Sequence, residues 1–134
     1  MAVLDASVQI ALVNRADPHR EAALRWYRSA IAKAEPLHAP WIIVAELGSG
    51  IRRGLGDRDL AQQAVQSLIA DGMVQLVPVD ADLAARAAAI AIDHGIRGCD
   101  AVYVALAQAL GESLVTFDQQ QSTRGAAAAT VLRL

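Results

Sequence analysis

Cysteine, lysine and aromatic residues are scarce in this chain of 134 residues, and each scarcity narrows its possible functions. The single cysteine, Cys99, cannot form an intramolecular disulfide or a zinc site built from cysteines, and we expect it to be buried as a small apolar side chain. Aromatic residues make up 4% of the chain, which argues against binding single-stranded nucleic acid by stacking bases on aromatic rings. Lys33 is the only lysine, so few ammonium groups are present to neutralise carboxylates.

Long apolar runs and a basic leader segment are also missing from the sequence. Charged residues interrupt every apolar run well before membrane-spanning length, and the chain opens Met-Ala-Val-Leu-Asp without basic residues. We therefore expect a soluble, cytoplasmic protein with no membrane partner. Hydrophobic residues nevertheless make up 54% of the chain, which is enough for a single domain, residues 1–134, with its own core.

The net charge of −2 is unusual for a protein that binds nucleic acid. If four of the acids bind cations, however, the 12 basic residues outnumber the ten remaining acids. The rest of the surface is then mildly basic, which permits RNA binding without requiring it.

Short segments typical of strands alternate with helical patterns along the whole chain. We expect strands near residues 2–4, 37–39, 73–79, 113–117 and 130–132. We expect helices near residues 7–14, 17–35, 41–53, 57–70, 80–93 and 100–109. Strands separated by helices predict an α/β fold, in which a short parallel sheet is flanked by helices on both faces.

Local signals refine these helix predictions. Asp17 followed by Pro18 predicts a helix start with Asp17 as the N-cap, and either Asp80 or Asp82 is expected to cap a later helix. The two glycines inside the helix expected at 41–53 weaken it by about 1 kcal/mol each relative to alanine. We therefore expect Gly48 and Gly50 to pack closely against another backbone.

Four of the 14 acidic residues stand in apolar surroundings. They are Asp5 after Val-Leu, Glu46 within Ile-Val-Ala-Glu-Leu, Asp100 before Ala-Val-Tyr-Val, and Asp118 after Val-Thr-Phe. Asp5 and Asp118 also end expected strands, and sites in parallel sheets form outside the carboxyl ends of the strands. The other acids are expected to be solvated surface residues or helix caps: Asp17, Asp57, Asp59, Asp71, Asp80, Asp82, Asp93, Glu21, Glu35 and Glu112.

A carboxylate in an apolar setting is unfavourable by several kcal/mol unless another group compensates it. Four acids brought together would also repel one another and raise their own pKa values. A divalent cation removes both problems, and hard carboxylate oxygens favour Mg²⁺ or Mn²⁺. Such an ion can polarise a phosphodiester and activate a bound water. The four acids therefore indicate hydrolysis of a phosphate ester without a covalent enzyme intermediate.

Each acid also has a purely structural interpretation. Asp5 could accept hydrogen bonds from backbone N–H groups at the start of the next helix, and Asp100 could be an N-cap. Asp118 could form an Asx-turn, and Glu46 could lie on an exposed helix face. One acid alone does not distinguish these possibilities, whereas the four together favour a site.

The four acids lie in four short motifs. These are Val-Leu-Asp-Ala-Ser at 3–7, Val-Ala-Glu-Leu at 44–47, Arg-Gly-Cys-Asp-Ala-Val-Tyr-Val-Ala-Leu-Ala at 97–107 and Leu-Val-Thr-Phe-Asp at 114–118. In this order and in a chain of this size, they resemble the PIN domain, and specifically the VapC toxins of bacterial and archaeal toxin–antitoxin pairs. The resemblance extends from Val3 to the last expected strand, and the third motif is the most specific.

This resemblance implies a three-layer α/β/α fold and a Mg²⁺- or Mn²⁺-dependent endoribonuclease. It also implies a homodimer, held inactive by a small antitoxin protein that lies across the active-site groove. By the same resemblance, the catalytic and metal-coordinating residues are Asp5, Glu46, Asp100 and Asp118. The hydrogen-bonding residues behind the first and fourth acids are Ser7 and Thr116.

The sequence departs from the family after Asp118. Three glutamines follow, so no further carboxylate is at hand to support the fourth position. Asp118 could therefore contact a metal directly or through water, and the site could hold one metal ion or two.

Basic side chains near the motifs are candidates for binding RNA. Arg52 and Arg53 end an expected helix, and Arg97 stands three residues before Asp100. A guanidinium can form paired hydrogen bonds with phosphate oxygens, although each of these arginines could equally be a solvated helix end. The histidines have no spacing typical of metal ligands and are expected at surface or capping positions: His19, His38 and His94.

The apolar run at residues 41–44 is too continuous for one face of an amphipathic helix. We expect this run, which begins with Trp41, to be buried in the core. An interface with a second subunit or an antitoxin helix is the alternative.

Two other families with acidic sites fit the sequence less well. A response-regulator receiver needs adjacent acids after the first strand and a lysine near the last strands, but Asp5 has no acidic neighbour and Lys33 lies too early. A phosphatase of the haloacid-dehalogenase type needs a second aspartate two residues after the nucleophile, where this chain has Ser7. The remaining alternative is a catalytically silent, PIN-like protein-interaction module, although such domains usually lack some of the acids that this chain retains.

Overall fold

The computed structural model describes residues 1–134 and contains one five-stranded sheet in which every strand is parallel to its neighbours. The strands lie in the spatial order β3-β2-β1-β4-β5. Their bounds are β1 Ala2–Leu4, β2 Leu37–Pro40, β3 Val74–Val77, β4 Ser113–Thr116 and β5 Val131–Arg133. All five expected strands are therefore present in a parallel sheet.

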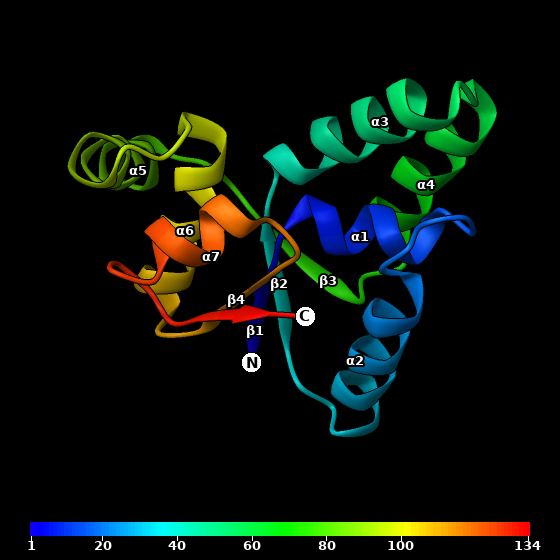
Figure 1. Cartoon of the computed structure of the whole chain (residues 1–134), viewed down its shortest axis with the longest axis horizontal. Coiled ribbons are helices and arrows are strands. Elements are labelled where there is room, and N and C mark those ends of the chain that lie inside the picture. The colour runs from blue at the N-terminus through cyan, green and yellow to red at the C-terminus, as the bar shows by residue number, and fades with distance from the viewer.

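Seven helices cover the two faces of this sheet. Figure 1 shows α1 to α4 on one side of the sheet and α5 to α7 on the other. The first group is α1 Ala6–Val13, α2 Arg20–Ala32, α3 Ile42–Leu55 and α4 Arg58–Ala70. The second group is α5 Ala81–His94, α6 Gly98–Leu110 and α7 Gln119–Gly125. The expected three-layer α/β/α fold is thus confirmed, and none of its helices combines the length and apolarity needed to cross a membrane.

The core forms because the central strands are apolar on both faces. Buried residues of β1 and β4 include Val3, Leu4, Leu114 and Val115. Helix α1 packs against β4, and helix α6 packs against β1, β2 and β4. Strands covered on both faces carry consecutive apolar residues rather than alternating ones, as β1 does throughout and β4 does at Leu114 and Val115. Helix α6 is itself buried from Asp100 to Ala107, which makes it the central helix of the second layer.

The connections between strands reverse direction between β1 and β4. From β1 the chain moves to β2 and then β3, whereas from β4 it moves to β5 on the opposite side. In parallel sheets a crevice opens at the carboxyl ends of the two strands where this reversal occurs, and ligands bind there. Asp5 follows β1 and Thr116 ends β4, so the fold brings the first and fourth motifs to this crevice.

Two helices differ from the sequence prediction. Helix α2 begins at Arg20 rather than Asp17, because the Asp17 carboxylate accepts a hydrogen bond from the backbone N–H of His19 at 2.8 Å and forms a turn before the helix. The sequence pattern did not predict α7, because this segment has no apolar periodicity. In α5, by contrast, one of the two expected caps is present, and it is Asp80.

Several side chains also lie in surroundings that the sequence did not predict. Cys99 is exposed rather than buried, because it lies in the first turn of α6 beside an open cavity. Trp41 is 44% exposed, because it precedes α3 and only part of the apolar run, including Ile43, faces inward. Glu112 is buried rather than solvated, because its carboxylate pairs with His38 Nδ1 at 2.9 Å. The surface or capping position expected for His38 is therefore also wrong.

The two glycines in α3 allow close packing, but their neighbours are side chains rather than the expected backbone. A Cβ atom at Gly48 would lie 3.3 Å from Val65 Cγ2 of α4. A Cβ atom at Gly50 would lie 2.5 Å from Ile10 Cδ1 of α1. The glycines therefore set how closely α3 approaches both neighbouring helices.

Candidate active site

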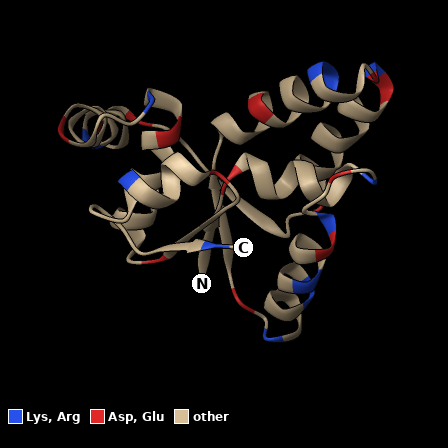
Figure 2. Ribbon diagram, in the orientation of Figure 1, with Lys and Arg blue, Asp and Glu red and all other residues tan.

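All four predicted acids line one open cavity of about 510 Å³ at the carboxyl ends of β1 and β4. Their positions are Asp5 before α1, Glu46 within α3, Asp100 in the first turn of α6 and Asp118 before α7. Figure 2 shows acidic segments at the start of α1, in α3 and near the start of α6, all at the same end of the sheet. The fold thus gathers carboxylates that are widely separated in the sequence.

Asp5 has donors for both of its carboxylate oxygens. Its Oδ2 atom accepts hydrogen bonds from the backbone N–H and the Oγ of Ser7, at 3.2 and 2.5 Å, and from Thr116 Oγ1 at 2.9 Å. Its Oδ1 atom accepts one from Gln121 Nε2 at 3.2 Å. Burial raises the pKa of Asp5 above its ordinary value, and these hydrogen bonds oppose the rise. Asp5 therefore caps α1 and also presents a carboxylate to the cavity.

Ser7 and Thr116 link the ends of β1 and β4. Besides its bond to Asp5, Ser7 Oγ accepts a hydrogen bond from the backbone N–H of Phe117 at 3.0 Å. Thr116 Oγ1 likewise accepts one from the backbone N–H of Asp118 at 2.9 Å. The two hydroxyl groups thus hold the first motif against the fourth and restrict the orientation of the Asp5 carboxylate.

Glu46 is half-buried within α3 and accepts a hydrogen bond from the Tyr103 hydroxyl of α6. Burial raises the pKa of Glu46, and the negative charges of Asp5 and Asp100 raise it further, while the hydrogen bond from Tyr103 lowers it. Burial, together with the bond to Glu46, also raises the pKa of Tyr103. The Tyr103 hydroxyl therefore stays protonated and is a permanent donor to Glu46.

Asp100 lies inside the first turn of α6 and is not its N-cap, a position that Arg97 occupies. Arg97 Nε donates a hydrogen bond to Asp100 Oδ2 at 2.8 Å. Arg97 Nη2 also lies 3.9 Å from Asp118 Oδ2. The hydrogen bond to Asp100 is the main reason that the pKa of Arg97 is raised. Because the Arg97 side chain is 72% exposed, solvent weakens both ion pairs.

Asp118 combines a structural role with its place in the cavity. Its Oδ1 atom accepts a hydrogen bond from the backbone N–H of Gln121 at 2.9 Å, which makes Asp118 the N-cap of α7. Its Oδ2 atom faces Arg97, and 31% of the side chain is exposed. One oxygen of Asp118 therefore caps helix α7, and the other faces the Arg97 guanidinium.

Gln121 is a residue of this site that the sequence analysis did not identify. It is fully buried, and its Nε2 atom lies 3.2 Å from both Asp5 Oδ1 and Asp100 Oδ1. A glutamine within a run of three gave no signal, because no helix was predicted around it. The signal that could have located it is Asp118 as an N-cap followed by glutamines, which are good helix formers.

The three candidate RNA-binding arginines lie in different places. Arg53 and Arg97 line the cavity, whereas Arg52 does not. Arg52 Nη1 donates a hydrogen bond to the carbonyl of Gly56 at 2.7 Å and so caps the carboxyl end of α3. Cys99 also lines the cavity, so its thiol is accessible beside the acids.

No three acidic, histidine or cysteine side chains lie close enough in this structure to hold a metal ion directly. The chemistry of the donor set nevertheless fits Mg²⁺ or Mn²⁺, since four carboxylates line one cavity of about 510 Å³. These ions prefer oxygen ligands, and Mg²⁺ usually keeps several of its waters, so carboxylates can hold it across a wider opening. The site thus fits a hydrated divalent cation better than a fully dehydrated one.

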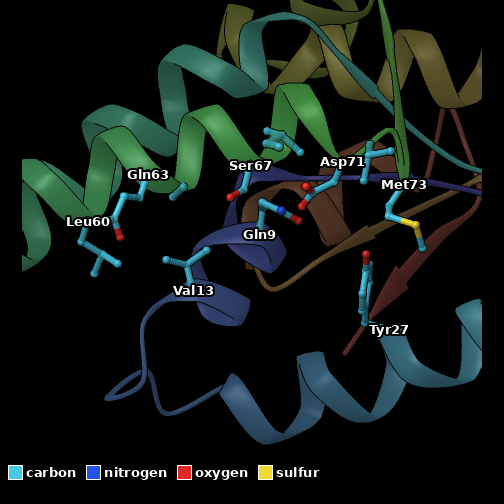
Figure 3. A pocket seen from close by; sticks show the side chains of 11 residues that line it. Gln9, Val13, Tyr27, Leu60, Gln63, Ser67, Asp71 and Met73 are labelled. Atoms are coloured by element: carbon cyan, nitrogen blue, oxygen red, sulfur yellow. The ribbon is translucent and has the colours of Figure 1, made fainter.

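A second cavity, of about 320 Å³, lies between α1, α2 and α4 (Figure 3). Seven of its 11 lining residues are hydrophobic, and the polar ones are Gln9, Gln63, Ser67 and Asp71. With one acid and no basic side chain, this cavity lacks the groups that metal-assisted phosphate chemistry requires. The cavity at the carboxyl ends of β1 and β4 is therefore the candidate active site.

Comparison with known proteins gives a family that agrees with this geometry. The model of the PIN-domain family matches residues 2–126, a range that includes all four acids of the cavity. Ribonuclease VapC3 from Pyrobaculum aerophilum is 34% identical to this chain over 122 residues, which are 88% of this chain and 89% of that protein.

Solved structures share the fold over nearly the whole chain. VapC20 from Mycobacterium tuberculosis, described as a toxin that cleaves the sarcin–ricin loop, has a TM-score of 0.82 and 22% identity, and the match covers 97% of each chain. A toxin–antitoxin complex from Klebsiella pneumoniae has a TM-score of 0.66 and 20% identity, over 98% of this chain and 96% of that one. The family match, the VapC3 relative and the shared fold together lead to one conclusion. This chain belongs to the PIN-domain family.

Proposed function

We propose that this protein is an endoribonuclease that hydrolyses RNA phosphodiester bonds with Mg²⁺ or Mn²⁺, and that it is the toxin of a type II toxin–antitoxin pair. The observation that carries this proposal is the convergence of four carboxylates from distant motifs on one cavity. The relative that is 34% identical over most of both chains is itself a ribonuclease, which supports RNA as the substrate.

The residues that would hold the cation are Asp5, Glu46, Asp100 and Asp118. When bound, a divalent cation polarises the phosphodiester and lowers the pKa of the water that attacks phosphorus. The protein itself orients the carboxylates, because Ser7 and Thr116 donate to Asp5 and Tyr103 donates to Glu46. Such supporting hydrogen bonds set how well a carboxylate binds metal.

The rim of the cavity supplies positive charge for a polyanionic substrate. Arg53 and Arg97 both line it, and the Arg97 guanidinium is largely exposed. Arginine binds phosphate oxygens through paired hydrogen bonds and also stacks on bases. We therefore expect the RNA phosphates next to the cleaved bond to contact these two side chains.

The proposed protein partners are a cognate antitoxin and a second copy of this chain. The complex from Klebsiella pneumoniae pairs a toxin with an antitoxin, which supports an antitoxin as partner. Large apolar side chains on the surface offer area for both contacts, and they include Trp41, Val79, Ile92 and Leu110. An antitoxin that lies across the cavity would block RNA from the four acids.

The test of this proposal is cleavage of total cellular RNA by the purified, antitoxin-free protein with Mn²⁺ or Mg²⁺. We expect cuts at discrete positions that disappear in EDTA and fall roughly 100-fold or more in Asp100→Asn. Asp59→Asn is the matched control, because it removes the same charge from an exposed position on α4. This control should cleave as the parent does.

Two results would contradict the proposal. Absence of cleavage across several RNAs and both metals would favour the catalytically silent interaction module. Cleavage that persists in Asp100→Asn and in EDTA would show that the four acids of the cavity do not carry the reaction.

A further inference from the structure

Gln121 is the one residue that forms hydrogen bonds with three of the four acids. Its side-chain Nε2 lies 3.2 Å from Asp5 Oδ1 and 3.2 Å from Asp100 Oδ1. Its backbone N–H donates to Asp118 Oδ1 at 2.9 Å. These acids belong to three different segments of the chain, so a single residue of α7 connects the end of β1, the first turn of α6 and the loop after β4.

The chemistry of its neighbours fixes the orientation of the Gln121 amide. Carboxylate oxygens accept hydrogen bonds, so the NH₂ group, and not the carbonyl oxygen, must face Asp5 and Asp100. The two N–H bonds of this group match the two carboxylates. The carbonyl oxygen Oε1 is buried without a hydrogen-bond partner, which is unfavourable. A glutamine retained for packing alone would gain nothing from this arrangement, since an apolar side chain of equal size avoids it.

Gln121 also differs from the other donors in its burial. Asp100 Oδ2 accepts from Arg97, whose side chain is 72% exposed and can turn away into solvent. Gln121 is fully buried, so its amide cannot leave the two acids without a movement of α7. Gln121 is therefore the fixed connection between Asp5 and Asp100, whereas Arg97 contacts Asp100 and Asp118 and can leave both for solvent.

We propose that Gln121 is a positioning residue for the acidic site, and that its amide holds Asp5 and Asp100 at the separation at which both can serve one divalent cation. This inference rests on the proposed function, because it concerns how the proposed metal site is built. Gln121 acts only through the two carboxylates and contacts neither the cation nor the RNA.

The test compares Gln121→Met with Gln120→Met. Methionine has nearly the length and flexibility of glutamine but no N–H donor, and Gln120 is an exposed neighbour on the same helix. For each protein we would measure the Mn²⁺ dissociation constant by calorimetry and the thermal midpoint in EDTA. Gln121→Met should weaken Mn²⁺ binding about tenfold or more and lower the metal-free midpoint by several degrees. Gln120→Met should change neither value.

A second variant, Gln121→Glu, keeps the shape of the side chain but places a third carboxylate against the other two. Its metal-free midpoint should lie below that of the parent, because two N–H donors are replaced by a repelling charge. Added Mn²⁺ should raise this midpoint by more degrees than it raises that of the parent. This comparison does not require Gln121→Met to fold.

The inference is overturned if Gln121→Met folds and binds Mn²⁺ as tightly as the parent, whatever its unfolding temperature. A metal-free midpoint of Gln121→Glu equal to that of the parent would overturn it as well. A parent protein that binds no Mn²⁺ would instead contradict the proposed function, and the metal-free midpoints would still show whether Gln121 holds the two acids.

Discussion

Among the single residues of the site, burial disfavours the ionised form of two of the four acids. The pKa values of Asp5 and Glu46 are both raised, and burial is the largest cause in each case. Hydrogen bonds from Ser7, Thr116 and Tyr103 oppose this rise. The folded site therefore gains free energy when these carboxylates take up positive charge, whether from protons or from a cation.

This gives a prediction for the pH dependence of the metal-free protein. A carboxyl group with a higher pKa in the folded chain than in the unfolded chain binds more protons when folded. Its contribution to stability is therefore largest at low pH and falls as the pH rises through the folded pKa. As the pH rises from the ordinary pKa of an aspartate through the raised pKa of folded Asp5, the free energy of unfolding of Asp5→Asn relative to the parent should rise. Urea unfolding in EDTA measures this difference, and a difference that falls with pH would contradict the burial of an ionised Asp5.

The sequence identifies some residues of the site because their surroundings are local. The four acids stand out since apolar residues lie directly beside them in the chain. Glu112 has no such signal, because its burial depends on His38, which is 74 residues away in the sequence. Gln121 could not be identified from the sequence for the same reason, since only the fold brings its partners Asp5 and Asp100 close to it.

At the scale of elements, helices with an apolar stripe could be predicted from sequence, and α7 could not. Helices α3 and α5 have apolar faces and end at glycines in the left-handed conformation, Gly56 and Gly95. Helix α7 consists of Gln-Gln-Gln-Ser-Thr-Arg-Gly and has no such face. It forms because Asp118 caps it and because Gly125 packs on α6. Its stability is tertiary, so periodicity does not reveal it.

The packing of α7 can be tested at its last residue. A Cβ atom at Gly125 would lie 3.0 Å from Cγ2 of Val104, a buried side chain of α6. Gly125→Ala should therefore destabilise the protein by about 1–2 kcal/mol, because Val104 has little room to move. Gly54→Ala is the matched control in α3, where a Cβ meets nothing within 4 Å, and it should stabilise the protein by about 0.5–1 kcal/mol. Urea unfolding measures both, and equal effects at the two positions would contradict the close contact between α7 and α6.

At the scale of the whole molecule, the strand order explains why four distant motifs form one site. The reversal of connections between β1 and β4 places Asp5 and Asp118 at one crevice. Helices α3 and α6 lie on opposite faces of the sheet, and they bring Glu46 and Asp100 to the same carboxyl end of it. The parallel sheet and the carboxyl-end position of the site could be predicted from the alternation of elements. The pairing of particular side chains could not be predicted from the sequence, because it depends on how the helices pack.

The proposed homodimer requires apolar surface for the contact between the two copies. Ile92 of α5 is 81% exposed, and Trp41 before α3 is 44% exposed, so both side chains are free to contribute to such a contact. Size-exclusion chromatography with light scattering should show a dimer of the antitoxin-free protein at micromolar concentration, and a monomer would contradict the proposed homodimer.

Anomalous diffraction from a crystal grown with Mn²⁺ would show whether the four acids hold a divalent cation. We expect an anomalous peak in the cavity lined by Asp5, Glu46, Asp100 and Asp118, held by carboxylate oxygens directly or through water. We also expect the Arg97 guanidinium to move away from Asp100, since cation and guanidinium compete for the same carboxylate. A cavity without a peak, in which Arg97 still pairs with Asp100 at saturating Mn²⁺, would show that the four acids do not hold a cation.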